Sequence, residues 1–157
     1  MKKMETMKLQ GKEYATVATR IKEFRQDCPN GLIETKFEKL ESGEMVFEAR
    51  ILKDKANQNS GEATGHSIGK ITGDKAFEKL ETIAIGRALA LLGYMASGEI
   101  ASSDEMERFM EFKQLEWAKT LNACETLEAL QVAWASLPGE AKIPMTQLKE
   151  QLKSKLS

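Results

Sequence analysis

The side chains that could carry out chemistry in this sequence are few and far apart. His66 is the single histidine, and the two cysteines, Cys28 and Cys124, form no C-x-x-C pair. The sequence contains no phosphate-binding glycine loop, no nucleophile elbow and no paired acidic metal motif. A lone histidine on a strand is far more often structural than catalytic. We therefore expect a protein that is not an enzyme and that uses no metal and no cofactor.

The cation that stands out is Arg87, which follows Gly86 inside the apolar stretch AFEKLETIAIGRALALLGY, residues 76–94. A guanidinium in a buried helix needs an anionic partner, because an unpaired buried charge is very costly. Glycine in a helix interior costs about 1 kcal/mol relative to alanine. Two partners stay open for Arg87: a phosphate group, or a carboxylate in a salt bridge, for example from a glutamate of the first two strands.

Composition limits the possible classes of protein. The chain has 157 residues, of which 41% are hydrophobic, and a formal net charge of −1. This suits one folded domain plus a small addition, and no apolar run reaches the roughly 18 residues of a membrane span. The basic N-terminus lacks the apolar segment of a secretory signal. These features indicate a reducing, cytoplasmic location, and a nucleic-acid binder of this charge would have to gather cations locally or by assembly.

The spacing of apolar residues predicts an α+β fold. Helical spacing predicts an amphipathic helix over about residues 12–27, and alternation predicts three antiparallel strands at about 33–38, 45–52 and 63–71. A long helix capped by Asp74 follows over about 74–96 and packs on the sheet. The stripe expected to face the core consists of Phe77, Leu80, Ala84, Ala88, Leu91 and Met95.

Small residues mark places where another backbone could approach closely. One face of the third strand is made of Ala63, Gly65, Ser67 and Gly69. Either a helix packs on this face, or the face forms the floor of a groove. Gly86 and Gly93 lie opposite the core stripe of the long helix, which favours close approach of a neighbouring subunit or of a phosphate backbone.

The C-terminal part reads as a small helical bundle. Ser102 with Glu105 fits a capping box for a helix over about 103–123. Thr126 can cap a second helix that ends at Pro138, and a third helix follows Pro144. We expect residues 1–105 to form one domain and residues 106–157 a second one. Both tryptophans lie in this second domain, where a place in the core is favoured over a base-stacking platform.

The stretch ETIAIGRALALLGYMASGE, residues 81–99, resembles a helix signature of the Rad fifty-two superfamily. The shared features are an acidic start, then Arg87-Ala88-Leu89, and then Gly93. Together with the preceding strand, the stretch resembles short phage versions of single-strand annealing proteins. The C-terminal bundle is similar in style to those of annealing proteins of the Redβ and RecT kind.

This resemblance implies a homo-oligomeric ring or helical filament that binds single-stranded DNA and anneals complementary strands without ATP. Such a protein acts in homologous recombination and DNA repair, here in the host cytoplasm of a bacteriophage. Arg87 carries over as a DNA contact, and the other candidates are Lys70, Lys75, Lys79, Arg50, Lys53, Lys55, His66 and Tyr94. The subunit interface would use Gly86, Gly93, Gly65 and Gly69.

The expected partners are single-stranded DNA and further copies of the chain, with no membrane. The C-terminal helices would contact the host single-strand binding protein or a phage exonuclease. The alternative is an oligomeric scaffold or adaptor that recruits a partner through its helical tail without binding DNA.

Overall fold

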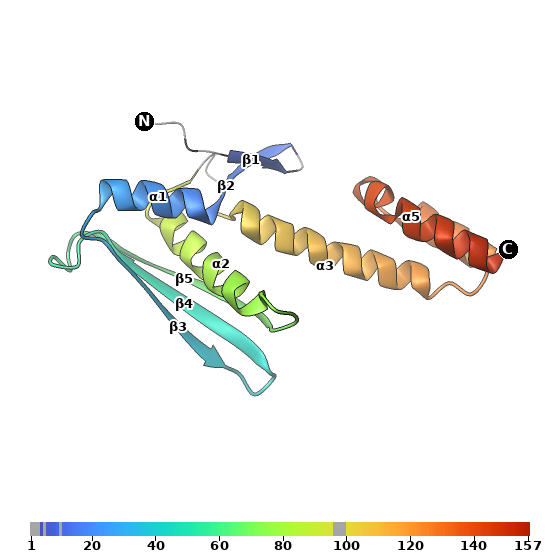
Figure 1. Cartoon of the computed structure of the whole chain (residues 1–157), viewed down its shortest axis with the longest axis horizontal. Coiled ribbons are helices and arrows are strands. Elements are labelled where there is room, and N and C mark those ends of the chain that lie inside the picture. Colours follow the sequence, from blue (N-terminus) through green and yellow to red (C-terminus); the bar gives the residue numbers. More distant parts are fainter. Residues whose placement is uncertain (1–3, 5, 10, 96–99) are drawn as a thin grey trace. The chain divides into compact units, whose positions relative to one another are not determined.

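The computed structural model describes residues 4, 6–9, 11–95 and 100–157, and the chain divides into two compact units, residues 1–106 and 107–157. The elements of the first unit are β1 (Thr6–Leu9), β2 (Lys12–Ala15), α1 (Val17–Asp27), β3 (Leu32–Lys39), β4 (Glu44–Leu52), β5 (Glu62–Lys70) and α2 (Ala76–Leu91) (Figure 1). Helix α3 (Ser103–Asn122) begins in this unit and continues into the second, which also holds α4 (Leu127–Ser136) and α5 (Gly139–Leu156). The predicted α+β fold class is confirmed.

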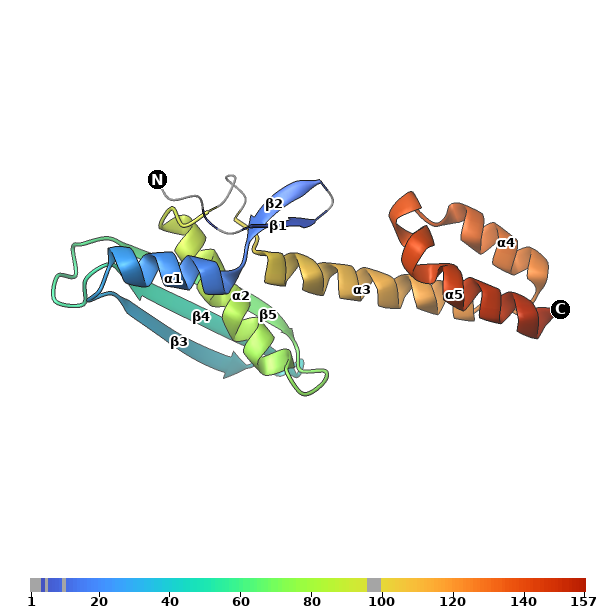
Figure 2. The ribbon, with the colours of Figure 1, turned by 45° about the horizontal axis from the view of Figure 1, so that its top comes forward.

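The first unit is built on an antiparallel sheet in the order β3-β4-β5. Successive residues of β4 alternate between buried and half-buried, since side chains of a strand point to opposite faces. Met45, Phe47, Ala49 and Ile51 are the buried set, and they form one core with Phe24 of α1 and Leu80 of α2. Helices α1 and α2 therefore cover the same face of the sheet (Figure 2), and the other face is left open.

The predicted helix over residues 12–27 is wrong in its first third. Residues 12–15 form β2, which pairs with β1 through a turn at Gly11, whose φ is +78°. Helix α1 starts only at Val17, because Thr16 caps it: the Thr16 Oγ1 accepts a hydrogen bond from the Thr19 N–H at 3.0 Å. The apolar spacing of Tyr14 and Val17 fits a helix as well as a strand that leads into one.

Helix α2 is shorter than the predicted range of 74–96. Lys75, not Asp74, occupies the cap position, and the helix ends at Leu91. It stops there because Gly93 adopts a φ of +99°, which favours glycine, and donates its N–H to the Ala90 carbonyl at 2.9 Å. Residues 96–99 lie outside the described residues.

The expected core stripe of α2 is only partly buried. Leu80, Ala84 and Ala88 are fully enclosed, whereas Leu91 is 59% exposed. Gly86, which was expected to allow close approach of a neighbouring subunit or of a phosphate backbone, is buried against α1 of the same chain. Helix α2 is thus covered on two sides, by the sheet and by α1.

The second unit is a three-helix arrangement with its own core. This core consists of Trp117, Leu121, Leu130, Leu137, Ala141, Met145 and Leu152. The predicted caps are present, with the Ser102 Oγ accepting the Glu105 N–H at 3.2 Å and the Thr126 Oγ1 accepting the Ala129 N–H at 3.1 Å. Helix α5 begins before Pro144 rather than after it and includes this proline. Within the described ranges, no helix has the length and apolar character needed to cross a bilayer.

Candidate nucleic-acid interface

Arg87 pairs with a carboxylate of the same chain. Its Nε lies 3.2 Å from both carboxylate oxygens of Glu105, and its Nη2 also donates to Glu105 Oε1. The hydrogen bonds that Arg87 donates to Glu105 raise the pKa of the Arg87 guanidinium above its ordinary value. Of the two partners that the sequence left open, the structure shows the carboxylate. It comes from the first turn of α3 and not from the strands.

The buried arginine of this unit is Arg20, which the sequence analysis did not single out. Its Nη1 donates to the carbonyls of Gly86 and Ile100, at 2.7 and 2.8 Å, and its Nη2 donates to the Ala101 carbonyl at 2.9 Å. Burial lowers the pKa of the Arg20 guanidinium, while the nearby carboxylates of Glu105 and Asp104 act in the opposite direction. The signal that could have found it is its position on the apolar stripe of α1, between Val17 and Phe24.

Two of the four glycines assigned to a subunit interface, Gly86 and Gly65, make close contacts within the chain. A Cβ on Gly86 would lie 2.6 Å from Val17 Cγ2 of α1. A Cβ on Gly65 would collide with the backbone of α2 at Ala84 and Ala88. Gly69 lies on the same face of β5 as Gly65, and Gly93 ends α2 through its positive φ. Helix α2 packs on the small face of β5 at Gly65 and α1 packs on Gly86, so these two glycines no longer support an oligomer on packing grounds.

Tyr94 does not lie on a surface that a nucleic acid could contact. It is 9% exposed, and its ring makes an edge contact with Phe24, with 5.6 Å between the ring centres. Its hydroxyl donates to Asp27 Oδ2 at 3.2 Å and lies 3.8 Å from the Cys28 sulfur. Burial, followed by the hydrogen bond with Cys28, raises the pKa of this hydroxyl well above its ordinary value.

The open face of the sheet carries two further candidates, both of them beside carboxylates. Arg50 pairs with Glu62, with its Nη2 3.2 Å from Glu62 Oε2, and His66 Nε2 lies 3.3 Å from Glu48 Oε2. The charged or titratable side chains on this face are Glu34, Lys36, Glu38, Glu44, Glu48, Arg50, Glu62, His66 and Lys70. Carboxylates outnumber lysines and arginines among them, so this face has an excess of negative charge.

The remaining lysines lie at two ends of the sheet. Lys53 and Lys55 follow β4, and the Lys55 N–H bonds to the Asn30 carbonyl at the start of β3. Lys70 ends β5 opposite Glu44, which is the first residue of β4 and so belongs to the other end. The structure therefore does not bring Lys53 and Lys55 together with Lys70.

Two exposed lysines lie where α2 begins. Lys75 occupies the cap position of α2, and Lys79 lies one turn further on the same side of the helix. Lys70 ends the neighbouring strand β5 but lies on its open face, which is turned away from α2. We call Lys75 and Lys79 the α2 lysine cluster. The Lys75 side chain makes no capping hydrogen bond, and the Ala76 N–H donates to the Gly73 carbonyl at 3.3 Å. The positive end of the helix dipole lies beside these lysines.

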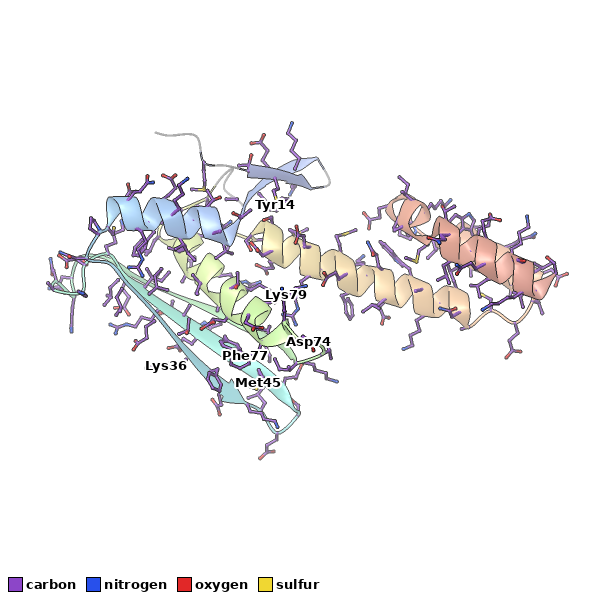
Figure 3. All side chains as sticks on the ribbon, viewed as in Figure 1. Tyr14, Lys36, Met45, Asp74, Phe77 and Lys79 are labelled. Atoms are coloured by element: carbon purple, nitrogen blue, oxygen red, sulfur yellow. The ribbon has the colours of Figure 1, made fainter. Side chains whose placement is uncertain are left out.

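Carboxylates also lie at this end of α2. Asp74 and Glu78 are exposed, and Figure 3 shows Asp74, Phe77 and Lys79 at the same end of the helix. They offset the local positive charge, so this end of α2 is not a broad basic surface. Among the residues that the structure describes, no group of three or more His, Cys, Asp or Glu side chains is placed to hold a metal ion.

Residues 21–92 match a protein-family model described as Slr1353 N-terminal dsRNA-binding domain-like. The matched segment runs from within α1 through β3, β4 and β5 to the end of α2. No curated protein and no solved structure matches the chain.

This match contradicts the resemblance to Rad fifty-two-like annealing proteins, and that interpretation of residues 81–99 is wrong. The motif that carried it, Arg87-Ala88-Leu89, is less than one turn of an apolar helix, and many helices contain it. Annealing, recombination, a phage source and a ring assembly have no support from the match.

Proposed function

We propose that the first unit binds nucleic acid, and that its ligand is double-stranded RNA. The observation that carries this proposal is the α2 lysine cluster, Lys75 and Lys79, in the first turn of α2. Lysine side chains and helix N-terminal N–H groups are the usual phosphate ligands of proteins that bind nucleic acid. The likeness of residues 21–92 to a family described as dsRNA-binding domain-like supports the choice of RNA duplex.

The scarcity of exposed aromatic rings favours a duplex over a single strand. Binding of single strands relies on aromatic side chains on which successive bases stack. In the described part of the first unit, Phe37 is the exposed aromatic residue, at 63%, and its ring packs against Phe47 and Phe77. Duplex RNA is recognised by its shape through phosphate and 2′-hydroxyl contacts, which need no stacking platform.

The acidic parts of the unit limit where the duplex can lie. The turn between β3 and β4 carries Glu41, Glu44 begins β4 opposite Lys70, and the open sheet face has an excess of carboxylates. Phosphates are therefore expected at the start of α2 and not along the sheet. With so few cations, binding is expected to be weak, with a shallow dependence on salt, because the slope of log K against log salt scales with the number of phosphate contacts.

A ligand panel tests the proposal. Fluorescence anisotropy of the full chain is measured with one sequence of about 20 base pairs, prepared as duplex RNA, duplex DNA, single-stranded RNA and single-stranded DNA. We expect duplex RNA to bind most tightly, because the 2′-hydroxyls and the A-form grooves distinguish it from DNA. Tightest binding of either single strand, or binding of none of the four at low salt, would refute the proposal.

A further inference from the structure

The second unit contains a groove between α4 and α5 that has no role in the proposed binding of RNA. Its volume is about 230 Å³, and its lining residues are Leu127, Leu130, Gln131, Trp134, Lys149 and Lys153. Helix α4 contributes the apolar side of the groove, and α5 contributes the two lysines. This volume is below the range of most sites for drug-sized ligands and suits one or two inserted side chains.

Two cations, one helical turn apart, border this apolar surface. Lys149 Nζ lies 5.4 Å from the centre of the Trp134 ring and 2.6 Å from Glu150 Oε1. Lys153 is exposed in the last turn of α5. Residues four apart on a helix are neighbours on its surface, so Lys149 and Lys153 present a pair of positive charges along one edge of the groove.

We propose that this groove binds a short acidic peptide segment of a partner protein, with a large apolar side chain inserted beside Trp134 and carboxylates paired to Lys149 and Lys153. The apolar side of the groove favours a leucine or an aromatic side chain, and the lysine edge favours neighbouring Asp or Glu residues. A protein segment fits better than a nucleic acid, because the Lys149 ammonium covers a face of the Trp134 ring on which a base would stack.

Glu150 modulates this site. Its carboxylate already pairs with Lys149 but does not line the groove, so it competes with an incoming carboxylate. Neutralising Glu150 is therefore expected to strengthen peptide binding, whereas neutralising the lysines weakens it. Opposite effects of neighbouring substitutions on α5 distinguish this site from an unspecific attraction between charges.

The experiment uses the full chain and a fluorescein-labelled probe, the peptide Asp-Glu-Asp-Leu-Leu-Phe with an amidated C-terminus. Two control peptides replace either the acidic residues by Asn-Gln-Asn or the apolar residues by serines. We expect saturable binding of the probe and binding at least about fivefold weaker for either control. Lys149→Gln and Lys153→Gln should each weaken binding about two- to fivefold, and Glu150→Gln should strengthen it about twofold.

Lys155→Gln is the matched control, because it removes one lysine from the same last turn of α5 without changing the groove lining. A second test reverses the sign of the added charge. Gln131→Glu places a carboxylate in the groove lining and should weaken binding of the probe, whereas Gln151→Glu, outside the lining, serves as its control. Each variant is first shown by its thermal melt to keep the wild-type stability.

Four results would overturn the inference. They are absence of saturable binding, equal affinity for the uncharged peptide, equal losses in Lys155→Gln and Lys153→Gln, and loss of duplex RNA binding in the Lys149 and Lys153 variants. The last result would assign the groove to nucleic acid. Because the variants lie in the second unit, the first three results leave the RNA proposal for the first unit unaffected, whereas the fourth would contradict its placement in the first unit.

Discussion

At the scale of single residues, two arginines have opposite environments, since one is buried in the core and the other is exposed to solvent. Arg20 is fully buried and donates to three backbone carbonyls, those of Gly86, Ile100 and Ala101. These bonds join α1 to α2 and to the segment that enters α3. Arg87 is exposed on α2 and pairs with Glu105. The guanidinium that joins α1 to α2 and to the start of α3 is therefore that of Arg20.

Replacing Arg20 by methionine should destabilise the first unit strongly. The change leaves three carbonyls without their donor and removes the cation that faces Asp104 and Glu105. We expect a loss of about 3–5 kcal/mol in the free energy of unfolding, measured by urea denaturation. Lys22→Met, at an exposed position of the same helix, should change it by no more than about 0.5 kcal/mol. Equal losses in the two variants would contradict the assigned role.

Replacing Arg87 by alanine should have only a small effect. The Arg87 side chain is 47% exposed, so its pair with Glu105 is screened by solvent, and its loss should cost less than about 1 kcal/mol. Since its partner is a carboxylate, the salt dependence of RNA binding should stay unchanged. A decrease in the slope of log K against log salt would show that Arg87 contacts phosphate.

Stability at high pH should depend on Tyr94. The folded state holds the pKa of its hydroxyl above the ordinary value of about 10, so the unfolded state loses this proton first. The contribution is fully present below pH of about 10 and is lost as pH rises from there toward the folded-state pKa. Urea denaturation between about pH 9 and pH 11 should show a smaller decline for Tyr94→Phe than for the wild type. Identical declines would contradict this role.

At the scale of elements, the packing of α2 decides the architecture. The alternation in the three strands and the apolar run of α2 were sufficient to predict the sheet, its antiparallel order and the helix upon it. The spacing of apolar residues alone could not show that α2 is covered on a second side. A glycine at position 86 is compatible both with an exposed helix face and with close packing against another helix. The β1–β2 hairpin was missed for a similar reason, since Tyr14 and Val17 match helical spacing across a strand end.

The contact between α1 and α2 can be tested with Gly86→Ala. Alanine improves helix propensity by about 1 kcal/mol, but its Cβ would lie 2.6 Å from Val17 Cγ2. We expect a net loss of about 1–2 kcal/mol in the free energy of unfolding. Adding Val17→Ala should make room, so that Gly86→Ala no longer destabilises in that background. A stabilising effect of Gly86→Ala in the wild-type background would contradict the close packing.

At the scale of the whole molecule, a chain of net charge −1 must concentrate its cations if it is to bind nucleic acid. Composition alone indicated this requirement, but the sequence could not say where the cations gather. Folding pairs Arg87 and Arg50 with carboxylates, buries Arg20, and moves Lys53 and Lys55 to the far end of the sheet. The α2 lysine cluster remains the candidate, while the homo-oligomer stays a prediction without the packing argument that first supported it.

The most direct test of this account is the salt dependence of duplex RNA binding in two charge-matched double variants of the full chain. One is Lys75→Gln with Lys79→Gln at the start of α2, and the other is Lys53→Gln with Lys55→Gln at the opposite end of the sheet. We predict that the first lowers the slope of log K against log salt by about 1 to 2, since two phosphate contacts are lost, and that the second leaves it unchanged. Equal slopes in the two variants, or a decrease confined to the second, would contradict the central claim that RNA phosphates bind at the start of α2.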